Sequence, residues 1–437
     1  MKFVLPILGS VAAISLFAFS TTHQAAIAVE RPGYDETFEQ LELFADVLAR
    51  VRSQYVVDVD DSDLIEDAMN GMLASLDPHS AYISPESFRD LQLNNRGEYG
   101  GLGMEVTMED GFVKVISPID NTPAKRAGIQ AGDFITEIEG KSLLGATLSE
   151  AVEQMRGKPG EPINITIVRA GEDPMELDIT REIIERQTVR YEDKDGFGYI
   201  RIAQFNEKAS EGLKDAIKDL QKDYGGRIPG LILDLRGNPG GLLHQSVQVS
   251  SVFLDGGAIV STRGRRLDDE DVYNGERGEM AKGVPLIVLV DGASASASEI
   301  VAGAIQDYGR GILLGMTTFG KGSVQDVIPL NGGRDGALKI TTKRYYTPSG
   351  RSIQGAGIAP DIAVSYVPDD GEDRERFSEA SLPNAIANED EEANTPEEVE
   401  ILYPAEDFEV EDDFQLQQAI ALLKSGDYKT KLAELQE

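Results

Sequence analysis

Between Gly196 and Val367, apolar strands alternate with helical patterns, and this alternation constrains the fold more than any other feature. "GYIRI", "GLILDLR" and "VPLIVLV", which begin at residues 198, 230 and 284, have the composition of buried strands. The segments that begin at residues 209 and 298 repeat their apolar residues with a helical period. This order predicts an α/β sheet buried on both faces, with ligands and chemistry at the carboxyl ends of its strands.

The regions before this alternation have a different character. Residues 35–76 show the apolar stripes of two helices, and "SLDPHSAYIS" (75–84) then supplies turn residues. Residues 97–181 combine short alternating strands, glycine turns and one helical pattern from Thr147, which predicts a compact β-rich module.

The region after Pro368 is strongly acidic, and most of it is interpreted as a solvated linker. It closes with an apolar stripe of Leu416, Ile420 and Leu423, which predicts a terminal helix that docks on another part of the protein.

Charge and cysteine content exclude several functions. Lys plus Arg number 41 against 76 for Asp plus Glu, so the formal net charge is −35 and neither nucleic acid nor an anionic membrane surface is expected as a partner. Cysteine is absent, which removes disulfides, thiol nucleophiles and thiolate metal sites.

The first 28 residues have the form of a secretory signal. Lys2 precedes an apolar run from Phe3 to Phe19, and small residues lead to an expected cleavage after Ala28. The protein is therefore expected to be exported, into the periplasm. The alternative is an uncleaved membrane anchor, and membrane association is expected only in that case.

The stretch "GMTTFGKGSVQ" (315–325) comes within one residue of a nucleotide-binding loop. Gly322 stands where the hydroxyl residue should be, and the following "SVQDVIPL" reads as a strand instead of a helix. A nucleotide-dependent factor is therefore a weak alternative.

Ser296 lies where a buried strand passes into a helix, within "DGASASASEIV". Amides at a helix N-terminus can bind the oxyanion of an acyl transfer, so Ser296 is a candidate nucleophile. It also fits a capping box with Glu299, and the local pattern favours that role. A histidine base would be His79, which reads as a turn residue, or His244.

Lysine can replace histidine as the base if burial or a nearby positive charge lowers its pKa from about 10.4 towards 7 to 8. Lys321 stands between Gly320 and Gly322, which allow close backbone approach. If this segment is a strand, Gln325 shares the face of Lys321 and can orient its nitrogen. An exposed hairpin lysine is the alternative.

Together these residues resemble the carboxyl-terminal processing proteases, serine peptidases with a Ser-Lys dyad. The resemblance runs from Asp35 to about Val367 and rests on "LDPHSAYIS", "YGGLGMEV", "LILDLRGNPGGLL", "SASASEIVAGAIQDYGRGILLG" and "TTFGKGSVQ". It implies Ser296 as nucleophile, Lys321 as general base and Gln325 as the residue that aligns the lysine. The implied oxyanion hole uses the amides of Ala297 and of Gly240 or Gly241, and no metal or organic cofactor is implied.

The β-rich module resembles a PDZ domain, with "GLGM" as its carboxylate-binding loop. The resemblance implies that the amides of Leu102, Gly103 and Met104 hold the terminal carboxylate of a substrate. An extended tail would add a strand beside residues 104–108, against the helix of residues 147–155. The expected partners are protein substrates with apolar C-terminal tails. The sequence does not decide between a monomer and a homodimer. The alternative is a PDZ-bearing holdase or adaptor with a silent protease fold.

The predicted fold class is thus a multidomain α/β protein. Its expected divisions are a signal peptide (1–28), an N-terminal helical module (29–90), a PDZ domain (97–181), a protease core (182–367) and an acidic linker with a C-terminal helix (368–437).

Overall fold

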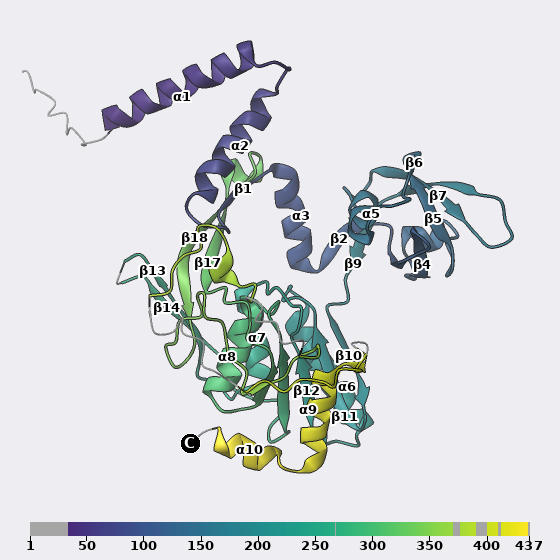
Figure 1. The fold of residues 1–437 in the computed structure, drawn as a ribbon, viewed down its shortest axis with the longest axis vertical. Coiled ribbons are helices and arrows are strands. Elements are labelled where there is room, and N and C mark those ends of the chain that lie inside the picture. The colour runs from purple at the N-terminus through teal and green to yellow at the C-terminus, as the bar shows by residue number, and fades with distance from the viewer. Residues whose placement is uncertain (1–33, 267, 370–375, 390–399, 410–411, 436–437) are drawn as a thin grey trace, which may run out of the picture. The chain divides into compact units, whose positions relative to one another are not determined.

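The computed structural model (Figure 1) describes most of the chain after the expected signal. The described residues are 34–266, 268–369, 376–389, 400–409 and 412–435. The predicted signal and its cleavage after Ala28 lie outside them. The chain divides into two compact units, residues 1–65 and 66–437.

The two predicted N-terminal helices are present, as α1 (Tyr34–Gln54) and α2 (Asp61–Ala74). α2 begins with Asp61 and Asp63 in its first turn, where negative charge is favoured by the helix dipole. Arg52, in the last turn of α1, forms an ion pair of 2.9 Å with Asp61. None of the described helices is long and apolar enough to cross a membrane.

The predicted β-rich module is also present and has its own apolar core. Its sheet has the order β3-β4-β5-β7-β8, with β6 paired to β5. The core includes the fully buried Val113, Ile135 and Ile165. Its elements are β3 (Met104–Glu109), β4 (Phe112–Pro118), α4 (Pro123–Arg126), β5 (Phe134–Ile138), β6 (Lys141–Ser142), α5 (Leu148–Met155), β7 (Pro162–Val168) and β8 (Met175–Thr180).

The predicted α/β sheet has the order β10-β11-β12-β15-β16-β19 and is parallel from β11 onwards. Residues of β12 and β15 alternate between two apolar cores, so both faces of the sheet are buried, as predicted. The strands are β10 (Val189–Lys194), β11 (Phe197–Ile202), β12 (Leu231–Asp234), β15 (Leu286–Val290), β16 (Ile312–Gly315) and β19 (Ile362–Ala363).

Different helices contribute to the two cores. The larger core includes residues of α6 (Ala209–Asp223), α7 (Leu243–Phe253) and α8 (Ala297–Asp307). The other includes residues of α9 (Phe414–Ser425) and α10 (Tyr428–Glu434), so the predicted docking of a terminal helix is confirmed, with Leu416, Ile420 and Leu423 against this core. The yellow C-terminal helices lie along the sheet in Figure 1.

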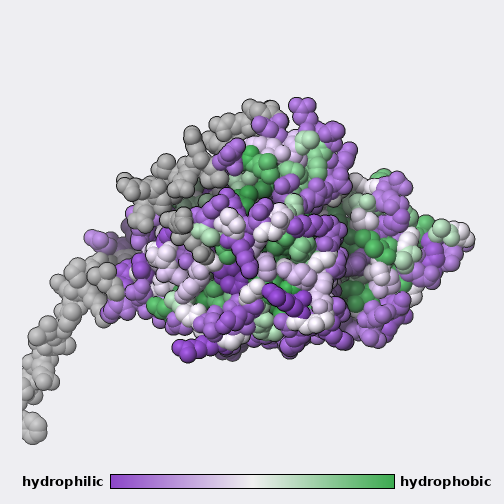
Figure 2. Space-filling model, turned by 90° about the horizontal axis from the view of Figure 1, so that it is seen from below, coloured by the Kyte–Doolittle hydropathy of each residue, from purple (hydrophilic) through white to green (hydrophobic). Residues whose placement is uncertain are grey.

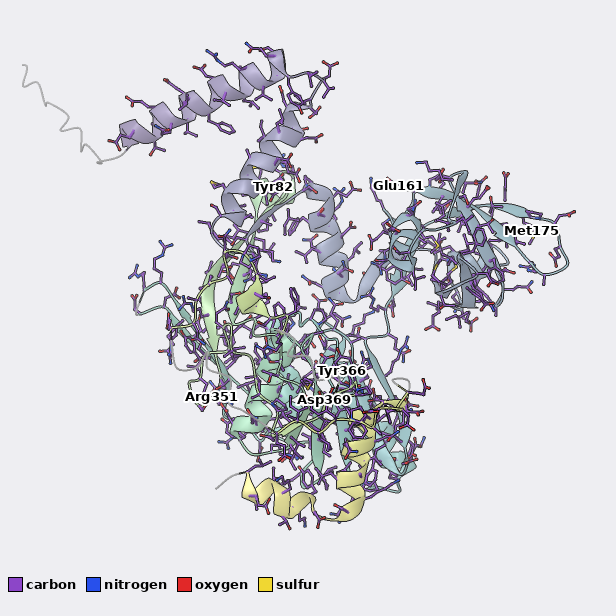
Figure 3. All side chains as sticks on the ribbon, in the orientation of Figure 1. Tyr82, Glu161, Met175, Arg351, Tyr366 and Asp369 are labelled. Atoms are coloured by element: carbon purple, nitrogen blue, oxygen red, sulfur yellow. The ribbon has the colours of Figure 1, made fainter. Side chains whose placement is uncertain are left out.

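A second sheet has the order β1-β18-β13-β14, with β17 also paired to β18. β1 comes from the "SLDPHSAYIS" segment, so that segment is more than the connecting turn that was predicted. Tyr82 of β1 (Figure 3) donates its hydroxyl to the carbonyl of Asp335 at 3.0 Å. The strands are β1 (Ala81–Ile83), β13 (Ala258–Gly264), β14 (Glu270–Asn274), β17 (Ser323–Pro329) and β18 (Ala337–Tyr346).

Short elements complete the described chain. Gly97, the C-cap of helix α3, takes the left-handed conformation that favours glycine. β2 pairs with β9 in a separate two-stranded sheet. These elements are α3 (Pro85–Arg96), β2 (Glu98–Gly101), β9 (Glu182–Glu185), and the 3₁₀ turns η1 (Leu330–Gly333) and η2 (Glu379–Ser381).

The interpretation of the acidic region as a solvated linker is wrong for residues 376–389. Arg376 donates to the carbonyl of Thr318 at 2.9 Å, and the ring of Phe377 lies 5.8 Å from that of Phe319. The Glu379 side chain is buried and accepts a hydrogen bond from Gln354. Net charge did not reveal these specific contacts. On the face in Figure 2, hydrophilic residues predominate and apolar patches lie between them.

The hydroxyl of Tyr428 ties the C-terminal helices to the sheet. It accepts from the N–H of Leu286 and donates to the carbonyl of the same residue, both at 3.0 Å, and Tyr428 is buried. We predict that Tyr428→Phe lowers the free energy of unfolding by about 1–3 kcal/mol, because the buried backbone of Leu286 loses both hydrogen bonds to the hydroxyl. Urea denaturation of the full chain measures this.

Tyr403→Phe is the matched control. Tyr403 is exposed and its hydroxyl makes no hydrogen bond within the described part of the chain. The urea midpoint of this variant should stay at the wild-type value, and equal midpoints for the two variants would refute the anchoring role of Tyr428.

Candidate active site

Ser296 immediately precedes α8, beyond the carboxyl end of β15. Its backbone has φ 55° and ψ −110°, a conformation that non-glycine residues rarely adopt and that costs free energy. The segment around Ser296 is tightly packed, since Ser294, Ser296 and Ser298 are all buried. The surrounding structure therefore holds Ser296 in a strained turn, at the edge of the sheet where chemistry was predicted.

The carboxylate of Glu299 holds this turn from inside α8. One oxygen accepts from the N–H of Ser296 at 2.7 Å and from the N–H of Lys321 at 2.9 Å. The other accepts from the hydroxyl of Thr318 and the N–H of Gly320, both at 2.6 Å. Burial raises the pKa of Glu299 to about 7, against the opposing effect of these hydrogen bonds.

The predicted capping box of Ser296 and Glu299 is therefore present. Glu299 does more than cap a helix, because its carboxylate also accepts hydrogen bonds from the N–H groups of Gly320 and Lys321. Capping and catalysis are alternative roles for Ser296 on the sequence alone, whereas in the structure the cap lies within the candidate active site.

Lys321 lies in the loop between β16 and β17, and its glycine neighbours are packed tightly. A Cβ atom on Gly322 would lie 2.3 Å from the backbone nitrogen of Gln354, and one on Gly320 would lie 3.0 Å from the carbonyl carbon of Gly355. The expected close backbone approach is thus confirmed. The predicted strand follows Gly322 as β17, so a nucleotide loop, which would need a helix there, does not form.

The side chain of Lys321 is directed to two oxygen acceptors. Its Nζ donates to Oε1 of Gln325 at 2.5 Å and to the carbonyl of Ser323 at 3.2 Å. Burial lowers the pKa of Lys321 to about 8, and the positive charge of Lys339 adds to the lowering. The direction agrees with the sequence prediction. Lys321 lies before β17, so its contact with Gln325 comes from the loop and not from a shared strand face.

Ser296 and Lys321 are close to one carboxylate but are not hydrogen-bonded to each other in the described structure. The Ser296 hydroxyl lies instead beside the phenol of Tyr345, on β18. Burial raises the pKa of Tyr345, while the hydroxyl of Ser296 acts to lower it. The nucleophile candidate and the base candidate are therefore joined through the carboxylate of Glu299, with no hydrogen bond between their side chains among the described residues.

The glycine loop after β12 approaches Ser296 closely. A Cβ on Gly240, whose φ is +101°, would lie 2.9 Å from both the Ser296 Cβ and the Ala297 nitrogen. The N–H of Gly240 is already bonded to Oδ1 of Asn238 at 2.9 Å. The amides of Gly241 and Ala297, by contrast, have no hydrogen-bond acceptor among the described residues.

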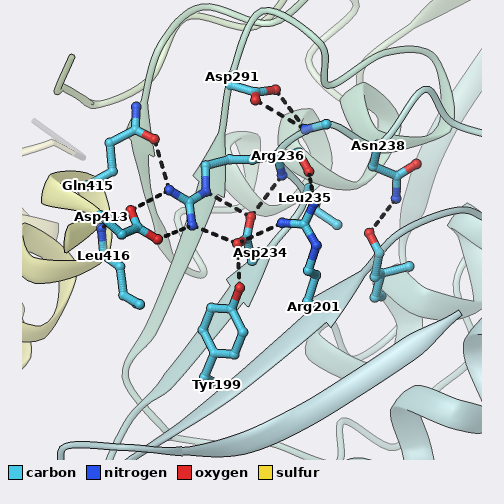
Figure 4. Close-up of polar contacts among 12 residues, drawn as sticks. Tyr199, Arg201, Asp234, Leu235, Arg236, Asn238, Asp291, Asp413, Gln415 and Leu416 are labelled. Atoms are coloured by element: carbon cyan, nitrogen blue, oxygen red, sulfur yellow. Dashed lines mark hydrogen bonds and ion pairs between the residues drawn. The ribbon is translucent and has the colours of Figure 1, made fainter. Parts of the chain in front are cut away.

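A buried ion-pair network supports the start of this loop (Figure 4). Asp234 is completely buried and bonds Arg236 at 2.7 Å and Arg201 at 3.1 Å. Arg236 reaches Asp413, the N-cap of α9, at 2.7 Å. Burial raises the pKa of Asp234, but the hydrogen bonds and charge of Arg236 outweigh it, and the pKa lies below its ordinary value. A salt bridge between Asp234 and Arg236 therefore braces the start of the loop.

Neither histidine occupies the site as a base. His79 contacts both carboxylate oxygens of Glu379, at 2.8 and 2.9 Å, so its partner is 300 residues away and not in the local turn. His244 is exposed on α7. The contact of His79 could not be found from the sequence, because nothing local links the two residues.

The PDZ-like module contains a groove with a cavity volume of about 350 Å³. Leu102, Gly103 and Met104 line it together with Val152 and Met155 of α5. The N–H groups of Leu102 and Gly103 have no acceptor within the described ranges. The structure thus brings the predicted carboxylate loop and the predicted groove helix to one site.

Comparison with known proteins agrees with this architecture. Residues 196–364 match Peptidase family S41, residues 100–180 match the PDZ domain, and residues 9–87 match the activating protease CtpB N-terminal domain. The chain is 53% identical over 330 residues to the carboxy-terminal-processing protease of Bartonella bacilliformis, which covers 75% of this chain and 76% of that protein.

Two further similarities extend this comparison. The carboxy-terminal processing protease CtpA of Bacillus subtilis is 34% identical over 363 residues, 82% of this chain and 76% of that protein. The solved structure of a photosystem II D1 C-terminal processing protease is 28% identical, with a TM-score of 0.42, and covers 74% of this chain and 92% of its own.

The fold and the family matches define a serine-type peptidase that carries a PDZ domain. More narrowly, the chain belongs to the carboxyl-terminal processing protease family. The resemblance stated from the sequence motifs is therefore confirmed, as are the α/β fold class and the peptidase class.

The packing of Gly322 generates a prediction. Gly322→Ala forces a methyl group into the backbone of Gln354 and disturbs the 3.0 Å hydrogen bond from the Gly322 N–H to Oε1 of Gln354. We expect a loss of about 1–3 kcal/mol in the free energy of unfolding. Displacement of the Lys321 loop should also lower kcat/KM by about 10-fold or more in a tail-cleavage assay.

Gly71→Ala is its control. Gly71 lies in α2, and a Cβ there would meet nothing within 4 Å. This variant should keep wild-type activity and gain slightly in stability. Wild-type activity and stability in Gly322→Ala would contradict the packing argument.

Proposed function

We propose that this protein is an exported, periplasmic endopeptidase that binds the C-terminal tails of protein substrates in its PDZ groove and cleaves them with a Ser296-Lys321 dyad. The observation that carries the dyad is the convergence of Ser296 and Lys321 on the buried carboxylate of Glu299. The low pKa of Lys321, about 8, and its contact with Gln325 support the role of base.

The chemistry proceeds through an acyl-enzyme. Lys321, as a neutral amine, takes the hydroxyl proton of Ser296 while Oγ bonds to the scissile carbonyl carbon. The resulting ammonium then gives a proton to the leaving amine, and the C–N bond breaks. A water molecule, deprotonated by the same lysine, hydrolyses the ester and restores Ser296. No metal or organic cofactor takes part.

The oxyanion of each tetrahedral intermediate would be held by the amides of Ala297 and the glycine loop. We assign the loop donor to Gly241, since its N–H lacks an acceptor whereas that of Gly240 is occupied by Asn238. The sequence left the choice between these two glycines open. Such donors act strongly because they are already oriented before charge develops.

Tail recognition would follow from the groove of the PDZ module. The amides of Leu102, Gly103 and Met104 would receive the terminal carboxylate, and an extended tail would pair with β3 (Met104–Glu109). Val152 and Met155 give the groove apolar contacts, which suit apolar tail residues. Membership of a peptidase family favours turnover over the alternative of a silent holdase.

Substitution of the dyad tests the mechanism. Ser296→Ala and Lys321→Ala should each lower kcat/KM for a protein with an apolar tail by at least about 1,000-fold, because they remove the nucleophile or its base. Lys282→Ala, at an exposed lysine, is the matched control and should cleave at the wild-type rate. Undiminished cleavage by either dyad variant would refute the mechanism.

The pH dependence tests the base. Lys321 must be neutral to accept a proton, so kcat/KM should fall about tenfold per pH unit below a pKa of about 8 and level off above it. Lys339→Gln removes a positive charge that lowers this pKa. The acidic limb of the kcat/KM profile, where the rate rises with pH, should therefore move to higher pH. Rate profiles between about pH 6 and pH 10 measure both enzymes. A limb that moves to lower pH would contradict the assignment.

A further inference from the structure

A chain of hydrogen bonds leads from Lys321 to the "SLDPHS" turn. Gln325 accepts from Lys321 through Oε1 at 2.5 Å and donates through Nε2 to the hydroxyl of Thr341 at 3.2 Å. The Thr341 hydroxyl donates in turn to Oδ1 of Asp77 at 3.0 Å. Asp77 is 3% exposed, and none of these contacts beyond Gln325 was expected from the sequence.

The direction of these bonds is fixed at the Asp77 end. Burial raises the pKa of Asp77, but hydrogen bonds outweigh it and the pKa lies below its ordinary value, so the group is an ionised, acceptor-only carboxylate. It accepts from the hydroxyl of Ser80 at 2.6 Å and from the N–H groups of His79 and Ser80, both at 2.9 Å. Thr341 must therefore donate its one hydroxyl proton to Asp77.

The donation from the Thr341 hydroxyl to Asp77 fixes the orientation of the Gln325 amide. With its proton used, the Thr341 hydroxyl presents only lone pairs to Gln325 and can pair with Nε2 but not with Oε1. The second Nε2 hydrogen goes to the hydroxyl of Ser323 at 3.0 Å. A flipped amide would set oxygen against the lone pairs of Thr341 and N–H against the ammonium of Lys321.

The orientation has a consequence for the base. A neutral lysine amine has two N–H groups and one lone pair. The two oxygens beside Lys321, Oε1 of Gln325 and the carbonyl of Ser323, can take both N–H groups. The lone pair is then left for the proton of the nucleophile.

We infer that Asp77 and Thr341 are positioning residues for the proposed dyad: they fix the amide of Gln325 so that its oxygen aligns the Lys321 amine. This inference rests on the Ser-Lys mechanism of the preceding section. Through Asp77, the "SLDPHS" turn then contributes to catalysis. A second hydrogen bond, from the Thr341 N–H to the Ser80 hydroxyl at 3.1 Å, holds the same turn against β18.

The first test removes the middle of the chain of bonds. Thr341→Val keeps the shape of the side chain and deletes the hydroxyl, and it should lower kcat/KM and the rate of Ser296 labelling by a fluorophosphonate by about 10- to 100-fold. Thr341→Ser restores the hydroxyl and should recover most of both rates. Thr342→Val, whose hydroxyl bonds Asp326 instead, is the matched control and should label at the wild-type rate.

The second test uses the pH profile, which separates the effect of the Asp77 charge on Lys321 from the alignment of Gln325. Lys339 of β18 lowers the pKa of Lys321, whereas Glu379, Glu299 and Asp77 raise it. Asp77→Asn removes one of these negative charges and lets Thr341 reverse its bond. The plateau of kcat/KM should fall by about 10-fold, and its acidic limb should move to lower pH. Thr341→Val should lower the plateau and leave the limb in place.

The outcomes separate the two proposals. Activity that survives in Ser296→Ala or Lys321→Ala overturns the dyad itself. Loss in those variants together with wild-type labelling in both Thr341→Val and Asp77→Asn overturns the positioning role alone. Urea midpoints of all variants show whether each is folded. If Thr341→Val does not fold, Asp77→Asn decides, and an unmoved limb with an unchanged plateau is then the refuting result.

Discussion

One buried carboxylate organises the candidate active site. Glu299 receives four hydrogen bonds, and two of their donors are the backbone N–H groups of Ser296 and Lys321. These two residues lie 25 positions apart on different elements, and the shared carboxylate joins their backbones. Burying a carboxylate is costly, and its raised pKa reflects that cost. Four well-formed donors compensate for the loss of water and fix the strained φ of Ser296.

A second set of charged residues supports the glycine loop that follows β12. Asp234 and Arg236 stiffen the start of the glycine loop, and Asp413 carries that network to the N-terminus of α9. The C-terminal helix therefore does more than cover the second face of the sheet. It is bonded directly to the residue that precedes the candidate oxyanion loop. A structural change in α9 would be transmitted to the loop, because the Arg236 guanidinium bridges the carboxylates of Asp234 and Asp413 (Figure 4).

The sequence predicted those parts of the structure that depend on local pattern. The strands and helices of the core, the capping box and the docking helix all have a periodicity or a motif of their own, and each was found near its predicted place. Ser296, Lys321 and Gln325 were candidates from the residue pattern, and the family resemblance implied their roles; the structure brings Lys321 and Gln325 into contact.

What the sequence could not predict are pairs that are distant in the chain. Asp77 meets Thr341 across 264 residues and His79 meets Glu379 across 300, and neither pair has a local signature. The acidic composition after Pro368 hid the packing of residues 376–389, because net charge describes solvation on average and not individual contacts. The contact of the Ser296 hydroxyl with Tyr345 depends on a side-chain torsion, which no sequence pattern encodes.

A chain with a net charge of −35 nevertheless keeps the pKa of one lysine low. Lys343, on β18, forms ion pairs with Asp269 and Asp271, and its pKa is raised. Lys321 has no ion pair within the described residues, although three carboxylates lie near enough to affect it. Each of these is already bound: Glu299 by four donors, Asp77 by the "SLDPHS" turn and Thr341, and Glu379 by His79 and Gln354. Although these carboxylates act to raise the pKa of Lys321, burial and the positive charge of Lys339 outweigh them, and the pKa stays below its ordinary value even in an acidic protein.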